Sequence, residues 1–197
     1  MTKTVRSARQ GHVMLVAALA MTAIMGACCL AVDVTAALRV KAAQRQRIEL
    51  AKDACMASLN ALKFAEDPAS ATESVIEAAL AADGASGKVT VAYRELPESQ
   101  TGSSRRVAGV YVRMEGSYRT IFGGLFGLRD LEVASEGAWS TMPYSSSEVW
   151  RPAAVRSTAW ELSMESGSVA SRSEGPLGST PQVLSDALAA ALAKSPV

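Results

Sequence analysis

The stretch that decides the fold is Gly11-His-Val-Met-Leu-Val-Ala-Ala-Leu-Ala-Met-Thr-Ala-Ile-Met-Gly-Ala-Cys-Cys-Leu-Ala-Val-Asp33. Residues 13–32 carry no charge, and Thr22 is the only hydroxyl side chain among them. At a rise of about 1.5 Å per residue, such a run spans about 30 Å as a helix, which matches the hydrocarbon core of a bilayer. A single span in lipid must satisfy its own backbone hydrogen bonds, so we expect a transmembrane helix over residues 12–33.

Two other interpretations of this stretch stay open. Residues 1–11 contain three basic and no acidic side chains, as the leader of a cleaved secretory signal does. Residues 25–28 form an imperfect lipoprotein cleavage box, but the apolar run continues past Cys28, which favours an uncleaved anchor. The third interpretation is a buried core helix, although such helices are rarely apolar on every face over this length.

The flanks of the span give its expected orientation. Basic residues lie on both sides, so their count alone does not decide the topology. The leading segment, residues 1–11, is short, and the large domain follows the span, as in a signal-anchor protein. We therefore expect a cytoplasmic leader and a domain on the far side of the membrane. Ala23, Gly26 and Ala27 make one side of the span thin enough for close packing against other helices.

Residues 34–66 predict an amphipathic stalk helix that continues the span. No glycine or proline interrupts them, and strong helix formers dominate. Apolar residues recur at three- and four-residue steps and make one stripe: Ile48, Ala51, Cys55, Leu59 and Leu62. Asp67-Pro68 ends the stalk, because the residue before proline is pushed out of helical geometry.

Residues 67–142 predict a small α+β head. A capping-box pattern at Ser70–Glu73 indicates a short helix, and alternation of apolar and polar residues then predicts three strands, over 89–94, 110–115 and 131–139. Residues 120–127, with paired glycines and apolar residues, favour a helical turn. The expected fold class is therefore α+β and pilin-like: one long N-terminal helix, transmembrane and then amphipathic, packed on a small antiparallel sheet.

Residues 143–197 are expected to form an extension rather than part of the head. The segment opens with Ser145-Ser-Ser147, is rich in serine, glycine and proline, and lacks a sustained apolar period. Thr180-Pro181 starts a terminal stretch whose apolar residues share one helical face, which predicts a terminal helix.

The sequence offers almost no catalytic chemistry. The only histidine is His12, at the membrane edge, and Cys55 is the only cysteine outside the span, so neither a cysteine–histidine metal site nor a disulfide framework is expected. We expect no catalytic residue, cofactor or metal. The net charge of +1 indicates no nucleic-acid partner. Asp33 and Asp53 are the two carboxylates of interest, although the simpler interpretations are favoured: a charge at the membrane boundary for Asp33 and a helix-surface ion pair for Asp53.

The order of these features resembles the TadE/TadG-like family of bacterial tight-adherence (Flp-type) pilus assembly proteins. The amino-terminal features shared with that family are the basic leader to Gly11, the apolar span, the step Ala31-Val32-Asp33, the charged helix 38–50 and the step Lys52-Asp53-Ala54-Cys55. The later strand–turn–strand order over 110–139 is also similar. Gly11, Asp33 and Asp53 are therefore the positions that match the family's motifs.

The resemblance implies a minor pilin or pseudopilin-like structural subunit of a pilus or related secretion apparatus, and not an enzyme. Its partners would be other pilin or pseudopilin subunits, the assembly platform of the inner membrane, and the lipid bilayer. It would cross the bacterial inner membrane once, with a periplasmic head, and could enter an extracellular pilus. Cleaved prepilins carry a glutamate five positions after the scissile glycine, where this chain has Val16, so we expect no processing after Gly11.

The alternative function is a membrane-anchored periplasmic ligand-binding or sensor domain. In that interpretation, the polar loop 97–106 and the tryptophans would form the ligand surface.

Overall fold

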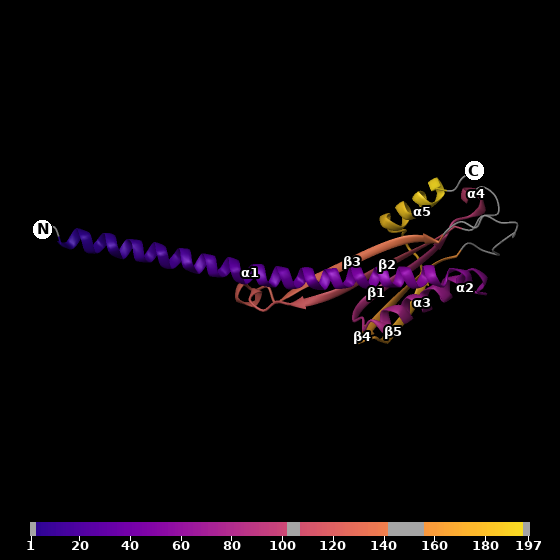
Figure 1. Ribbon diagram of the computed structural model, residues 1–197, viewed down its shortest axis with the longest axis horizontal. Helices are drawn as coiled ribbons and strands as arrows, with labels where there is room; N and C mark the ends of the chain where they lie inside the picture. Colours follow the sequence, from indigo (N-terminus) through magenta and orange to yellow (C-terminus); the bar gives the residue numbers. More distant parts are fainter. Residues whose placement is uncertain (1–2, 102–106, 142–155, 195–197) are drawn as a thin grey trace. The chain divides into compact units, whose positions relative to one another are not determined.

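The computed structural model describes residues 3–101, 107–141 and 156–194. Its elements (Figure 1), in chain order, are α1 (Lys3–Ala57), α2 (Leu59–Phe64), α3 (Pro68–Ala82), β1 (Gly87–Glu95), α4 (Glu98–Thr101), β2 (Ala108–Arg119), the 3-10 helix η1 (Gly123–Phe126), β3 (Asp130–Thr141), β4 (Ser157–Glu165), β5 (Ser168–Pro176) and α5 (Gln182–Lys194).

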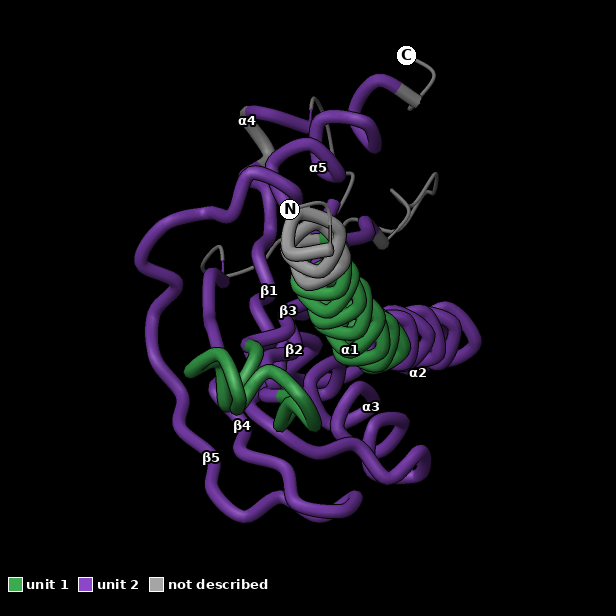
Figure 2. The backbone as a smooth tube through the Cα atoms, turned by 90° about the vertical axis from the view of Figure 1, so that its left-hand side faces the viewer, with its two compact units in different colours: residues 1–40, 118–131 green, residues 41–117, 132–197 purple. Residues whose placement is uncertain are grey.

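The chain divides into two compact units, coloured separately in Figure 2. Unit 1 consists of residues 1–40 and 118–131, which are the first part of α1 and the connection between β2 and β3. Unit 2 consists of residues 41–117 and 132–197, which are the second part of α1, helices α2 to α5 and most of the sheet.

Unit 2 is built on a five-stranded sheet in the order β3-β2-β1-β4-β5. β1 pairs antiparallel with both β2 and β4, so that Val91 lies between Val112 and Trp160. β4 and β5 form a hairpin whose turn residues, Ser166 and Gly167, both have positive φ, as the tight turns of right-twisted hairpins require.

One face of the sheet is covered by the second part of α1, by α2 and by α3 (Figure 1). The stripe predicted for the stalk supplies the helix side of this core, with Ile48, Ala51 and Cys55 at 0–3% exposure. Alternate strand residues such as Val91 and Val112 supply the sheet side, as the period of two requires. The predicted α+β fold, with one long helix packed on an antiparallel sheet, is confirmed.

The opposite face is covered by α5, which lies on the other side of the sheet from α3 (Figure 1). Leu184, Leu188 and Ala191 of α5 pack with Ala92 and Tyr111 in a second core. A two-sided sheet explains why β1 is buried at five of the seven positions from Val89 to Glu95, on both of its faces.

The expected extension 143–197 is wrong over much of its length. Residues 157–176 form β4 and β5 within the same sheet, and Trp160 is fully buried against the first core. Trp160, Leu162 and Met164 alternate toward that core, and this period of two could have predicted β4. Serine and glycine residues around the alternation made the segment resemble a linker instead. The expected terminal helix is α5, and residues 143–155 lie outside the described part of the chain.

Two helix boundaries also differ from those predicted. The stalk expected over residues 34–66 is broken at Ser58, where α1 ends and α2 follows. The next helix begins at Pro68, two residues before the predicted capping box, because the Asp67 side chain accepts hydrogen bonds from the N–H groups of Ala69 and Ser70. Glu73 is consequently not a capping residue.

Candidate functional site

The first part of α1 has the features of a membrane anchor. Among the described residues, α1 is the one helix that is long and apolar enough to cross a membrane. Large apolar side chains along it are exposed, with Val13 at 68% and Met25 at 68%. The molecule therefore carries an N-terminal helix of the transmembrane or signal-anchor type.

Asp33, at the end of the apolar run, connects the helical segment of unit 1 to the loop segment of the same unit. Its side chain is almost fully buried and accepts three hydrogen bonds from successive backbone N–H groups. The donors are the N–H of Ile121, 2.7 Å from Oδ1, and those of Phe122 and Gly123, 3.0 and 2.7 Å from Oδ2. Three charge-assisted bonds to one carboxylate fix the loop against the helix.

The loop held by Asp33, residues 120–128, is called here the apolar loop. The N–H of Thr120 donates to the carbonyl of Arg129 and closes the base of the loop, and the N–H of Leu128 donates to the carbonyl of Gly123 across it. A Cβ at Gly123 would lie 2.6 Å from the carbonyl oxygen of Leu128, so only glycine fits there. Gly127 ends η1 at φ +82°, the left-handed conformation that glycine adopts without strain.

Gly26 faces this loop within the same chain. A Cβ built on Gly26 would lie 3.7 Å from Cζ of Phe126, an ordinary van der Waals contact. Ala23 and Ala27 are exposed instead. Of the three residues predicted to pack against partner helices, Gly26 thus borders the apolar loop, whereas Ala23 and Ala27 remain accessible on α1.

Gly11 and Asp53, the two other positions that match the family motifs, are distant from Asp33 in the sequence and have different environments. Gly11 is part of α1. Asp53 lies on the part of α1 that belongs to unit 2, and its side chain is exposed, whereas that of Asp33 is buried. The structure does not bring these residues together into one site.

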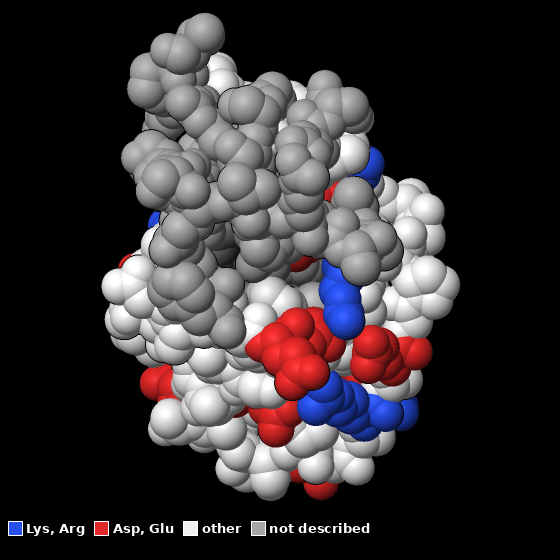
Figure 3. Space-filling model, turned by 90° about the vertical axis from the view of Figure 1, so that its right-hand side faces the viewer, with Lys and Arg blue, Asp and Glu red and all other residues white. Residues whose placement is uncertain are grey.

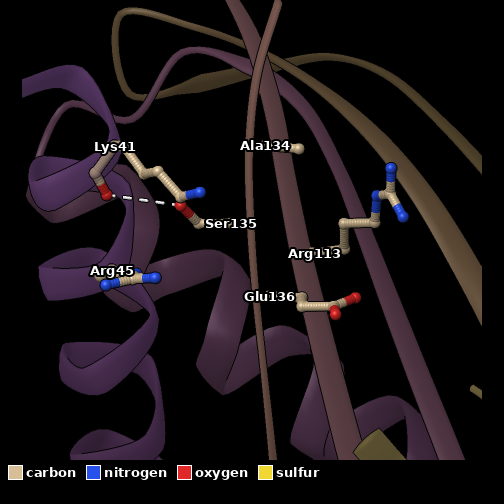
Figure 4. Close-up of a pocket in the computed structure, with 6 residues that line it drawn as sticks. All are labelled: Lys41, Arg45, Arg113, Ala134, Ser135 and Glu136. Atoms are coloured by element: carbon tan, nitrogen blue, oxygen red, sulfur yellow. Dashed lines mark hydrogen bonds between the residues drawn. The ribbon is translucent and has the colours of Figure 1, made fainter. Parts of the chain in front are cut away.

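Unit 2 contains a basic cavity of about 270 Å³ beside strand β3. Its lining residues are Lys41, Arg45, Arg113, Ala134, Ser135 and Glu136 (Figure 4). Ser135 points toward α1 and donates a hydrogen bond to the carbonyl of Lys41, whereas Arg113 and Glu136 point to the other side of the strand. The polar groups therefore do not converge on one reacting atom.

Two of these charges already have partners. The guanidinium of Arg113 contacts Glu115 at 2.7 Å, and Glu136 accepts a hydrogen bond of 2.7 Å from the hydroxyl of Tyr111. Burial, and then the bond to Glu136, raises the pKa of Tyr111 to about 12, so this phenol is not a base at neutral pH. Lys41 and Arg45 are left as the cationic groups of the cavity.

Neither a metal centre nor a tryptophan surface forms within the described residues. No group of three or more histidine, cysteine, aspartate or glutamate side chains is placed to hold a metal ion there. Trp139 and Trp160 are buried in the core, so the expected ligand surface of tryptophans is wrong for these two. Trp150 and part of the loop 97–106 lie outside the described residues.

Charges on the surface are mixed in sign. On the face seen in Figure 3, acidic and basic side chains lie side by side. Among the ion pairs of unit 2 is that between Arg156 and Asp67. A binding site for a strongly charged polymer would need a patch of one sign, which that face lacks over its described residues.

Sequence reasoning identified Asp33 but not its partner. The signal was present: residues 120–128 are uncharged and contain paired glycines, and Asp33 is the first acid after an uncharged run. Pattern alone could not pair two segments that lie about ninety residues apart.

Comparison of the chain with models of known protein families, with curated proteins and with solved structures gave no match.

Proposed function

We propose that this protein is a membrane-anchored structural subunit, of the minor pilin or pseudopilin kind, in a tight-adherence type pilus or a related secretion apparatus. It would act by packing its helix beside those of partner subunits, without a chemical step. The anchor would lie in the bacterial inner membrane, with residues 1–11 in the cytoplasm and the head in the periplasm.

The observation that supports this proposal most is the composition of α1. One uninterrupted helix, Lys3–Ala57, contains both the apolar exposed residues of the anchor and the buried stripe that closes the core of the sheet. The same helix therefore contributes residues both to the anchor and to the core of the head. In a subunit of the pilin type, as the resemblance implies, such a helix would serve both anchoring and assembly.

Exposed small residues on α1 provide the interface for partners. Ala23 and Ala27 are exposed, and small side chains let two helices approach closely in lipid, where van der Waals packing drives association. The partners that this chemistry fits are helices of other pilin or pseudopilin subunits and of the inner-membrane assembly platform.

Replacing Ala27 with Leu tests the proposal. The larger side chain keeps the segment apolar, so insertion is unchanged, but it separates the helices. We expect Ala27→Leu to lose most of its co-purification with pilin-type subunits from detergent-solubilised membranes of the native host. The matched control is Ala18→Leu, because Ala18 lies nine residues earlier and therefore on the opposite side of the helix.

A second candidate function, a membrane-anchored ligand-binding or sensor domain, is favoured by the basic cavity. Lys41 and Arg45 would bind a small anion there. The same experiment separates the two functions. Co-purification that is normal for Ala27→Leu but abolished by Arg45→Ala would overturn the proposal of helix-driven assembly and favour a binding function of the head.

A further inference from the structure

The apolar loop exposes a dense set of large apolar side chains. Within residues 120–128 there is no charged residue. Four of its large apolar side chains are at least half exposed: Ile121 at 67%, Leu125 at 80%, Phe126 at 64% and Leu128 at 50%. A contiguous apolar patch of this kind on a folded protein marks a surface that contacts a partner or a membrane.

The position of the loop within unit 1 indicates which of these it contacts. Asp33 fixes the start of the loop at the end of the apolar run, and Phe126 lies against Gly26, seven residues nearer the amino terminus. Seven helical residues correspond to about 10 Å along the axis. The loop therefore extends from the boundary of the apolar run back along it, so its exposed side chains are continuous with those of the anchor.

Many backbone N–H groups of the loop already have acceptors within the protein, as a loop in the bilayer would need. Irregular backbone is tolerated at membrane depth only where its polar groups are satisfied by protein. The N–H groups of residues 121–123 donate to the Asp33 carboxylate. Those of Leu125, Gly127 and Leu128 donate to carbonyls inside the loop, and the Thr120 hydroxyl donates to the carbonyls of Leu128 and Arg129.

Two arginines flank the apolar loop. Arg119 precedes it and Arg129 follows it, and both are exposed. Arginine side chains at the edge of an apolar segment extend to the interface, where they bind lipid phosphates. This arrangement, basic at the base and apolar at the tip, is that of a segment that enters a bilayer from one side.

We propose that the apolar loop is a second membrane-contact element, which inserts Ile121, Leu125, Phe126 and Leu128 into the same leaflet that α1 leaves. The inference rests on the anchoring role of α1 in the proposed function. It adds that the anchor is not a lone helix: the bilayer contacts α1 and the loop together, and Asp33 supplies the hydrogen bonds that the loop backbone would otherwise lose in lipid.

Spin labels on the full chain in liposomes of phosphatidylcholine and phosphatidylglycerol test this inference. Cys28→Ala and Cys29→Ala remove the accessible thiols, while burial raises the pKa of Cys55 to about 12 and keeps it unreactive. A nitroxide is then placed by Leu125→Cys. Reference labels are Leu19→Cys, in the span, and Ser168→Cys, at the exposed first residue of β5.

The measurement is the ratio of spin-label accessibility to oxygen, which partitions into lipid, over that to a water-soluble nickel chelate. We expect this ratio at Leu125→Cys to approach that at Leu19→Cys and to exceed that at Ser168→Cys several-fold. A ratio equal to that at Ser168→Cys overturns the inference. So does low accessibility to both reagents, because it means that protein, such as another subunit, covers the loop.

The reference label separates failure of this inference from failure of the proposed function. If Leu19→Cys also reads as aqueous, α1 is not in the membrane and the anchoring role fails. If Leu19→Cys reads as lipid-exposed and Leu125→Cys as aqueous, only the insertion of the loop is wrong.

Discussion

The Asp33 carboxylate accepts hydrogen bonds from three successive backbone N–H groups, two at Oδ2 and one at Oδ1. An ionised carboxylate suits this role because both of its oxygens are acceptors, whereas an amide side chain has only one acceptor oxygen. One charged residue at the end of the uncharged run 13–32 therefore determines the conformation of a loop about ninety residues later in the chain.

Removal of this carboxylate should open the loop. In Asp33→Ala, the N–H groups of residues 121–123 lose their acceptor, so we expect their hydrogen exchange to accelerate on the order of tenfold or more. Exchange measured by mass spectrometry on the full chain in detergent micelles checks this, and β1 provides an internal reference. Asp33→Asn, with one acceptor oxygen left, should give an intermediate rate.

The control for this substitution is Asp53→Ala, at an exposed carboxylate on the same helix. Its exchange over residues 121–123 should equal that of the unmodified chain. Equal rates for Asp33→Ala and Asp53→Ala would show that the loop does not depend on the carboxylate.

Helix α5 can pack closely on the sheet because β2 has a glycine, Gly109, at the contact. A Cβ at Gly109 of β2 would lie 2.7 Å from Cδ1 of Leu184 and 2.9 Å from Cγ of Leu188. These distances are shorter than real side chains allow, so the helix contacts the backbone of β2 directly. Leu184 is fully buried and Leu188 nearly so, which makes α5 part of the fold.

Truncation of the α5 contact should destabilise unit 2 measurably. Leu184→Ala should lower the free energy of unfolding by about 2–5 kcal/mol, the usual cost of a cavity at a buried leucine. Denaturant titration of the full chain in micelles, followed by fluorescence of the buried tryptophans, gives this value. Ser185→Ala, exposed on the same helix, should change it by less than about 0.5 kcal/mol.

Gly109→Ala alters the same contact on the β2 side. It should also lower the free energy of unfolding of unit 2, because Leu184 and Leu188 must shift to make room for the added methyl group. An unfolding free energy of Leu184→Ala equal to that of the unmodified chain would mean that α5 does not hold the second core together.

At the scale of the whole unit, the sheet joins segments that are distant in the chain. β4 lies beside β1 rather than beside β3, so the carboxy-terminal hairpin completes the surface on which α3 packs. Glu73 of α3 is fully buried, and Nη2 of Arg172 in β5 lies 2.8 Å from its Oε2. Neither carboxylate oxygen has an aligned hydrogen bond within the described residues, so this ion pair is incompletely compensated.

Glu73 makes the stability of the unit depend on pH. Its burial, together with the nearby Glu77 and Glu174, raises the pKa of its carboxyl group against the opposing effect of Arg172. A raised pKa means that the folded state binds a proton more readily than the unfolded state does. The contribution to stability is therefore lost as pH rises from the ordinary glutamate pKa through the raised one.

We accordingly expect the unmodified chain to gain stability relative to Glu73→Gln as pH falls from 7 toward 4.5. Glutamine cannot ionise, so the difference between the two unfolding free energies isolates the titration of Glu73. Denaturant titrations of both chains at several pH values measure this difference. A difference that is constant, or that shrinks as the pH falls, contradicts the assignment.

The sequence by itself determined the local features of this protein. The uncharged run 13–32 predicted the anchor, the stripe that includes Ile48 and Cys55 predicted the buried side of α1, and the alternation in β1 predicted its core face. For the anchor the physical reason is the length of the uncharged run, which matches the hydrocarbon core of a bilayer. For the stripe and the strand it is periodicity, because burial of one face repeats every few residues along the chain.

Only the tertiary structure decided the features that depend on distant pairing. β5 is mostly exposed and has few apolar residues, so its place in the sheet comes from backbone hydrogen bonds to β4. Such bonds do not produce a periodic pattern of side chains in the sequence. The contact of Asp33 with the apolar loop likewise involves backbone N–H groups, which every residue except proline carries. Because the sequence does not mark such donors, only the folded chain reveals which of them a carboxylate binds.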